Sequence, residues 1–175
     1  MEKIPFVNKE QLEAICAQYP TPFHLYDEAG IRATARAVRE AFAWNPGFRE
    51  HFAVKATPTP QILDILREEG CGVDCSSLTE LMMSERCGFQ GEEIMFSSNE
   101  TPAEEFVKAA QLGAIINLDD YTHIDFLQKT IGYIPETISC RFNPGGVFQL
   151  GESKEGFQVM DNPGDAKYGF TRPQL

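Results

Sequence analysis

Short hydrophobic runs alternate with amphipathic segments along most of this chain. The runs are centred near Val54, Val73, Met95, Ile116 and Ser139 and recur about every 20 residues, with a segment of helical spacing between each pair. The runs predict strands, and the segments between them predict helices. Strands that alternate with helices are typical of parallel βαβ units, which form either an open doubly wound sheet or a barrel. The pattern therefore predicts an α/β fold around a parallel sheet.

Side chains that cap helices precede four of the predicted helices, which strengthens the assignment of those segments. The first of the four is followed by Gly70, a residue typical of helix ends. The four signals are Thr59-Pro60, the capping box Ser77-Leu78-Thr79-Glu80, the segment Thr101-Pro102-Ala103-Glu104, and one of the adjacent residues Asp119 and Asp120.

The first 45 residues (1–45) predict a lead-in segment made of a helix, a short strand and a second helix. The first helix covers Lys9–Gln18, the strand covers Phe23–Tyr26, and Asp27 caps the second helix. Residues 46–175 then hold about five βα units. If the sheet belongs to an eight-stranded barrel, we expect these units to be its first part and the chain to be the front part of a larger protein.

Composition and charge limit the classes of binding partner and cofactor that this chain is expected to have. The 175 residues include 15 Lys and Arg against 26 Asp and Glu, a formal charge of −11, which argues against nucleic acid and anionic membranes as partners. No apolar run approaches the roughly 20 residues of a membrane span, and the first residues lack the order of a signal peptide. The five cysteines lack metal-ligand spacing, and the three histidines are scattered, so we expect reduced thiols, no metal site and a cytoplasmic protein.

A lysine and an aspartate each lie at the carboxyl end of a predicted strand. Lys55 ends the run Phe52-Ala53-Val54, and Asp74 follows Val73 in the next run. Catalytic groups of βα folds collect at the carboxyl ends of strands, and a desolvated lysine amine there can attack an aldehyde cofactor. The alternative interpretations are a lysine that only covers the sheet rim and an aspartate that only forms a turn.

An arginine and a glutamate complete the candidate set. Arg141 lies near the end of the apolar run Ile138–Phe142, where a buried charge needs a partner, and Asp74 is an obvious candidate. Glu80 has a sufficient structural role in its capping box, to which a role in a site would be additional. The chain contains no G-x-S-x-G elbow and no P-loop, which removes support for acyl transfer and nucleotide hydrolysis.

Four motifs occur in one order along the chain. They are Phe52-Ala53-Val54-Lys55-Ala56, the segment Gly70–Ser77 with Glu80, Arg141-Phe142-Asn143-Pro144, and Lys167-Tyr168-Gly169. Together they resemble the pyridoxal-phosphate (PLP) dependent decarboxylases of the alanine-racemase-like barrel class, in particular the diaminopimelate decarboxylases. The resemblance implies the N-terminal portion of a PLP-binding (β/α)8 TIM-type barrel, incomplete in this chain, and a homodimer with shared active sites. The resemblance also implies that the C-terminal β domain of the family is not part of these 175 residues.

The resemblance also implies roles for individual residues. Lys55 resembles the lysine that bonds PLP covalently, Asp74 the acidic group behind that lysine, and Arg141 the strand arginine that orders the same region. Glu80 matches the family's glutamate with a less defined role, and Lys167 resembles a lysine near the subunit contact. Residues 145–164 form a long loop that we expect to act as a lid over the substrate.

The implied reaction is decarboxylation of meso-2,6-diaminopimelate to L-lysine and CO2, in lysine biosynthesis. Ornithine, arginine and carboxynorspermidine decarboxylases of the same fold are rivals, because they would share Lys55, Asp74 and Arg141. A non-catalytic PLP-fold regulator and an unrelated α/β domain are alternatives from other classes. Several cofactor-holding groups of the family would lie beyond Leu175, so we expect the isolated chain to be inactive and to bind PLP weakly.

Overall fold

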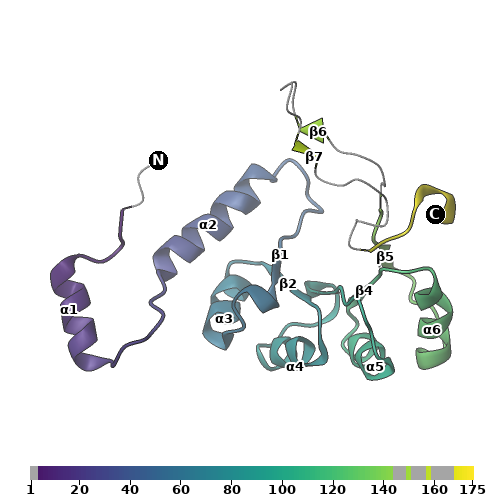
Figure 1. Cartoon of the computed structure of the whole chain (residues 1–175), viewed down its shortest axis with the longest axis horizontal. Helices are drawn as coiled ribbons and strands as arrows, with labels where there is room; N and C mark the ends of the chain where they lie inside the picture. The colour runs from purple at the N-terminus through teal and green to yellow at the C-terminus, as the bar shows by residue number, and fades with distance from the viewer. Residues whose placement is uncertain (1–3, 144–148, 151–156, 159–167) are drawn as a thin grey trace.

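The computed structural model describes residues 4–143, 149–150, 157–158 and 168–175 (Figure 1). Its centre is a five-stranded parallel sheet in the order β1-β2-β3-β4-β5, as the spacing of the hydrophobic runs predicts. The strands are β1 (His51–Ala53), β2 (Gly72–Cys75), β3 (Ile94–Phe96), β4 (Ile115–Leu118) and β5 (Ile138–Cys140). The connecting helices are α3 (Pro60–Glu68), α4 (Leu78–Arg86), α5 (Ala103–Gln111) and α6 (Thr122–Ile131).

Further helices, strands and turns lie outside this sheet. Helices α1 (Lys9–Gln18) and α2 (Glu28–Ala41) precede it, and β6 (Gln149–Leu150) pairs antiparallel with β7 (Phe157–Gln158). Three 3-10 turns complete the described elements: η1 (Val54–Ala56), η2 (Gly91–Glu93) and η4 (Arg172–Gln174).

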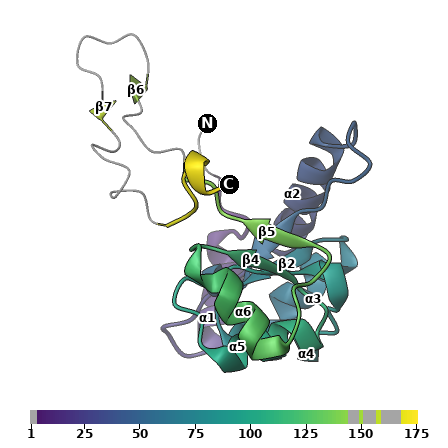
Figure 2. The same cartoon turned by 90° about the vertical axis from the view of Figure 1, so that its right-hand side faces the viewer.

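The four connecting helices all lie on one face of the sheet. Figure 2 shows α3, α4, α5 and α6 together on the same side of the strands. Burial follows this arrangement, because Val73 and Cys75 are completely buried whereas Asp74 between them is only half-buried. A doubly wound sheet carries helices on both faces, whereas a barrel carries them on the outer face alone. The layering therefore favours the barrel alternative.

The core lies between the sheet and these helices. Phe96 and Phe106 pack edge to face there, with ring centroids 6.4 Å apart. The largest completely or almost completely buried side chains of this layer include those of Leu63, Leu81, Phe89, Ile94, Phe96, Phe106, Ile116, Leu118, Leu127 and Phe170.

A sixth strand position is occupied beside β5. Phe170 forms a parallel bridge with Phe142, and the backbone N–H of Phe170 donates to the Arg141 carbonyl at 2.7 Å. Gly169 makes this possible, because a Cβ there would lie 2.7 Å from the Arg141 carbonyl oxygen, and its φ of 122° suits only glycine. The parallel arrangement therefore continues one position beyond β5.

The predicted strand Phe23–Tyr26 is wrong. These residues form no strand, because the described part of the chain offers them no partner; β1 pairs only with β2. Asp27 does cap α2, as predicted, by accepting a hydrogen bond from the Gly30 N–H at 3.0 Å.

The predicted helix starts are correct to within about two residues, but the capping contacts differ. Thr59 precedes α3 without a side-chain cap, and Pro102 rather than Thr101 is the residue that precedes α5. Asp120, not Asp119, serves the start of α6, since its carboxylate accepts from the Thr122 N–H at 2.8 Å. Asp119 is therefore left for another role.

Helix α2 is attached to α3 through the carboxylate of Glu69, which is only 6% exposed. Arg36 donates two hydrogen bonds to it, at 2.7 and 2.6 Å, and Arg32 donates a third at 3.1 Å. The hydrogen bonds from Arg36 are the main reason that the pKa of Glu69 falls to about 2. Charge pairing thus joins the helix of the lead-in segment to the first helix of the sheet layer.

This network predicts pH-dependent stability. A carboxyl group with a depressed pKa stabilises the fold above its unfolded pKa, near 4.5, and this contribution is lost as the pH falls toward about 2. We expect Glu69→Gln to lower the thermal midpoint at pH 7, and the gap to the wild type to shrink between pH 4.5 and 2. Glu68→Gln is the control, because Glu68 is exposed and contacts Arg32 alone. A gap that is constant across these pH values would contradict the interpretation.

Candidate active site

Lys55 and Asp74 lie at the carboxyl ends of neighbouring strands. Lys55 follows β1 within η1 and is exposed, and Asp74 lies in β2, where it pairs with Ala53 of β1 and Met95 of β3. Parallel strands place their carboxyl ends at the same edge of a sheet, which is the edge that βα enzymes use. The two candidate residues are therefore brought together at this edge.

The Asp74 carboxylate has a mixed environment. Burial raises its pKa, whereas the hydroxyl of Ser97, which donates to it at 2.5 Å, and the nearby positive charge of Lys55 lower that pKa. The negative charge of Glu80 raises it. Asp74 is thus a half-buried acid near the positive charge of Lys55, an arrangement typical of functional sites.

Glu80 takes part in capping the start of α4, as predicted, but one of its hydrogen bonds differs from the expected pattern. Its carboxylate accepts the backbone N–H of Ser76 at 2.9 Å and the hydroxyl of Ser77 at 3.1 Å. The Ser77 hydroxyl in turn accepts from the Glu80 N–H. The box is shifted by one residue, since Glu80 bonds the amide before the capping residue instead of the amide of Ser77 itself.

Glycine at position 72 brings β2 close to its neighbours. A Cβ at Gly72 would lie 2.5 Å from the Glu93 carbonyl oxygen and 2.7 Å from the ring of His51. Any larger residue would push the start of β2 away from the Glu93 backbone and the His51 ring. Close packing of the backbone at the start of β2 therefore requires glycine at position 72.

The predicted pairing of Arg141 with Asp74 is wrong. The Nε atom of Arg141 lies 3.5 Å from Oδ1 of Asp119, whereas Asp74 bonds Ser97. The reason is strand order: Asp119 follows β4, which is the neighbour of β5, whereas Asp74 lies on β2, two strands farther away. Arg141 directly follows β5 and is only partly buried, with 34% of its side chain exposed.

Asp119 is the functional candidate that the sequence reasoning missed. Its carboxylate also accepts hydrogen bonds from the side-chain amides of Asn99 and Asn117, the latter at 3.1 Å. Ser139 extends the network by donating to Asn117 at 2.9 Å. The available signal was the pair Asp119-Asp120 directly after a hydrophobic strand, where only one carboxylate is needed to begin the helix.

Two predicted features lie outside the described residues. Lys167 is one of them, and most of the predicted lid over 145–164 is the other; of that loop only the short pair β6 and β7 is described. Their predicted roles stay predictions.

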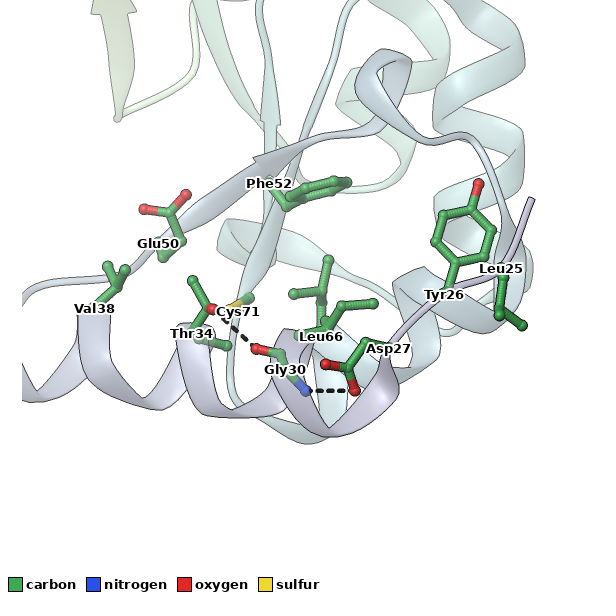
Figure 3. A pocket seen from close by; sticks show the side chains of 12 residues that line it. Leu25, Tyr26, Asp27, Gly30, Thr34, Val38, Glu50, Phe52, Leu66 and Cys71 are labelled. Atoms are coloured by element: carbon green, nitrogen blue, oxygen red, sulfur yellow. Dashed lines mark hydrogen bonds between the residues drawn. The ribbon is translucent and has the colours of Figure 1, made fainter. Parts of the chain in front are cut away.

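A cavity of about 560 Å³ lies away from these residues (Figure 3). It lies between α2 and the starts of β1 and β2, with Ala35, Phe52, Leu66 and Cys71 in its wall. None of the predicted site residues lines it. Its wall is mainly apolar, with the carboxylates of Asp27 and Glu50 also lining it, but it holds neither the lysine nor the arginine of the candidate set, so we place the candidate site at the carboxyl edge instead.

Two further observations concern the described residues only. They contain no group of three or more His, Cys, Asp or Glu side chains placed to hold a metal ion. None of their helices combines the length and the apolar character that a bilayer crossing requires.

The fold and this edge define a class of protein. Its members have a βα-barrel sheet with a lysine and a half-buried aspartate at the carboxyl ends of the strands. The family described as "Pyridoxal-dependent decarboxylase, pyridoxal binding domain" matches residues 28–172. The chain belongs to this family.

Individual relatives agree with this assignment. The chain is 42% identical over 164 residues to Protein TabA of Pseudomonas amygdali pv. tabaci, covering 94% of this chain and 36% of that protein. It is 33% identical over 141 residues to the diaminopimelate decarboxylase of Thermoplasma acidophilum, covering 81% and 33%. The chain thus spans about a third of the length of these curated relatives.

Solved structures resemble the fold as well. The diaminopimelate decarboxylase of Helicobacter pylori complexed with L-lysine has a TM-score of 0.62 and 26% identity, and the match covers 68% of this chain and 30% of that one. The ornithine decarboxylase of Entamoeba histolytica has a TM-score of 0.59 and 28% identity, covering 70% and 39%. These matches support the barrel alternative.

The electrostatics of Asp74 can be tested directly. We expect Ser97→Ala to raise the pKa of the Asp74 carboxyl, because the variant removes the hydrogen bond that favours the charged form. Carbon-detected NMR titration of the aspartate carboxyls would measure the change. Ser139→Ala is the matched control, since its hydroxyl bonds Asn117 instead, and an equal response to both variants would refute the assignment.

Proposed function

We propose that this chain supplies the covalent PLP anchor of an amino-acid decarboxylase, with Lys55 as the anchoring lysine. The observation that carries the proposal is the exposed Lys55 amine at the carboxyl rim beside the half-buried Asp74 carboxylate. Membership of the pyridoxal-dependent decarboxylase family supports it.

The residues present fit such a cofactor. A free amine that is exposed on the rim can react with an aldehyde, and no hydrogen bond or ion pair within the described part of the chain occupies it. Asp74 and Arg141 supply one negative and one positive group toward the same edge, and Glu80 lies close enough to influence Asp74. In this proposal Lys55 holds PLP covalently, and Asp74, Glu80 and Arg141 surround it.

Each of these residues has a distinct physical task in the reaction. PLP, when bound, supplies the electron sink that stabilises the carbanion left by the loss of CO2. The Asp74 carboxylate places a negative charge near the Lys55 amine, and the hydrogen bond from Ser97 fixes the orientation of that carboxylate. Arg141 supplies a permanent positive charge on the other side of the open edge.

The substrate we propose is meso-2,6-diaminopimelate, decarboxylated at its D-centre to L-lysine in lysine biosynthesis. The identity to diaminopimelate decarboxylases supports this choice. Ornithine, arginine and carboxynorspermidine are the rival substrates. The higher identity to Protein TabA is a reason to test the whole set instead of one compound.

We further propose the assembly implied by the resemblance. The whole protein would be a cytoplasmic homodimer with Lys167 near the subunit contact, in which residues 1–45 lead into the barrel that begins at residue 46. The five strands of the described sheet are fewer than the eight of a closed barrel, so we expect the 175-residue chain alone to bind PLP weakly and to be inactive.

The anchor assignment predicts a spectroscopic loss. The product of the whole gene should develop a near-visible absorbance band when PLP is added. Lys55→Ala should abolish that band and reduce the rate of decarboxylation at least about a hundred-fold. Lys108→Ala is the matched control, because Lys108 pairs with Glu85 on the helix layer. Survival of the band in Lys55→Ala would sink the proposal.

The substrate assignment predicts a preference. We expect the release of CO2 from meso-diaminopimelate to be at least about ten-fold faster, as kcat/KM, than from ornithine, arginine or carboxynorspermidine. A larger value for one of the rivals would transfer the function to that substrate. A PLP band without turnover of any of them would favour the non-catalytic alternative.

A further inference from the structure

The carboxylate of Asp119 is the most completely enclosed charge at the rim. Its side chain is 0% exposed, yet it contacts a cation and two amides, all of which can donate to it. An isolated buried carboxylate would be very costly, so each of these donors helps to keep the charge in place. This group of four residues, Asn99, Asn117, Asp119 and Arg141, is here named the Asp119 network.

The strands bring the network to the candidate site. Asn117 of β4 pairs with Ser139 of β5, and the Arg141 N–H continues the ladder by donating to the Leu118 carbonyl at 2.9 Å. Counting two residues along each strand places Asp119 opposite Arg141, on the face that carries Asn117 and Ser139. The same count from Met95, the partner of Asp74, reaches Ser97 and then Asn99.

The network is asymmetric in a way that suits a positioning role. Asp119 is buried and held by two amide hydrogen bonds and an ion pair, whereas Arg141 keeps 34% of its side chain exposed and is paired through Nε. A carboxylate fixed by two amides is a rigid support, and the guanidinium that it holds still reaches solvent at the open edge. Rigid supporting contacts of this kind are what keep a functional group in its productive geometry.

We propose that Asp119 is the positioning residue for Arg141 and that, through Arg141, it controls how tightly this edge holds PLP. This inference rests on the proposed function. It replaces Asp74 as the partner of Arg141 and separates the rim into two units, Lys55–Asp74–Ser97 and the Asp119 network.

The experiment is a double-mutant cycle on the product of the whole gene. The affinity for PLP is measured in each variant by titration of the near-visible absorbance band. We expect Asp119→Asn to weaken PLP binding about ten-fold, because it keeps the shape and removes the charge that holds Arg141. In the Arg141→Gln background the same substitution should cost less than about two-fold, since the residue to be positioned is gone.

Two comparisons make the cycle specific. Asp74→Asn and Arg141→Gln should multiply their losses, because Asp74 has no contact with Arg141. Asp120→Asn is the matched control one residue away, whose carboxylate serves Thr122 at the start of α6, and it should leave PLP affinity unchanged. If Asp119→Asn fails to fold, Asn99→Ala removes one support and should give a smaller loss that also disappears in Arg141→Gln.

The outcomes separate this inference from the function on which it rests. Wild-type affinity in Asp119→Asn, or losses that multiply with Arg141→Gln as a merely structural role requires, would overturn the inference and leave the proposed function intact. Wild-type protein that binds no PLP would overturn the proposed function, and the inference with it.

Discussion

The parallel register of five strands is the constraint on which everything else depends. Because successive side chains of a strand alternate between faces, Val73 and Cys75 enter the helix-covered core while Asp74 faces the opposite side. The same alternation carries Asn117, Ser139 and their successors to that side. A shift of one residue in any strand would exchange core and site residues, so the hydrophobic core and the chemistry at the rim are fixed by the same pairing.

Two carboxylates at this rim have different environments, and each environment suits a different role. Asp74 is half-buried and accepts a hydrogen bond from the Ser97 hydroxyl. Burial raises the pKa of its carboxyl, and the nearby charge of Lys55 lowers it. Asp119 is enclosed and bonded to amides and to Arg141. The first environment suits a group that adjusts a reactive amine, and the second suits a fixed support. Neither task could be predicted from the residue type alone, since both residues are aspartates at the carboxyl end of a strand.

Much of the fold could be predicted from local pattern, because strand spacing and helix starts are local properties. The same holds for Lys55 and Asp74, whose positions after hydrophobic runs place them at the carboxyl rim. The partner of Arg141 could not be predicted, since it depends on which strands are neighbours. The local pattern also offers Asp119 only as one of two residues that could cap a helix. The strand expected at Phe23–Tyr26 failed for a related reason: a strand needs a partner, and local sequence does not show whether one exists.

The central claim is that the amine of Lys55 bonds PLP. Reduction of the PLP-treated protein with borohydride makes that bond permanent, and mass spectrometry of its peptides then locates the added pyridoxyl mass. The account predicts this mass on the peptide that contains Lys55. A pyridoxyl group on another lysine, such as Lys108 or Lys129, with Lys55 unmodified, would contradict it.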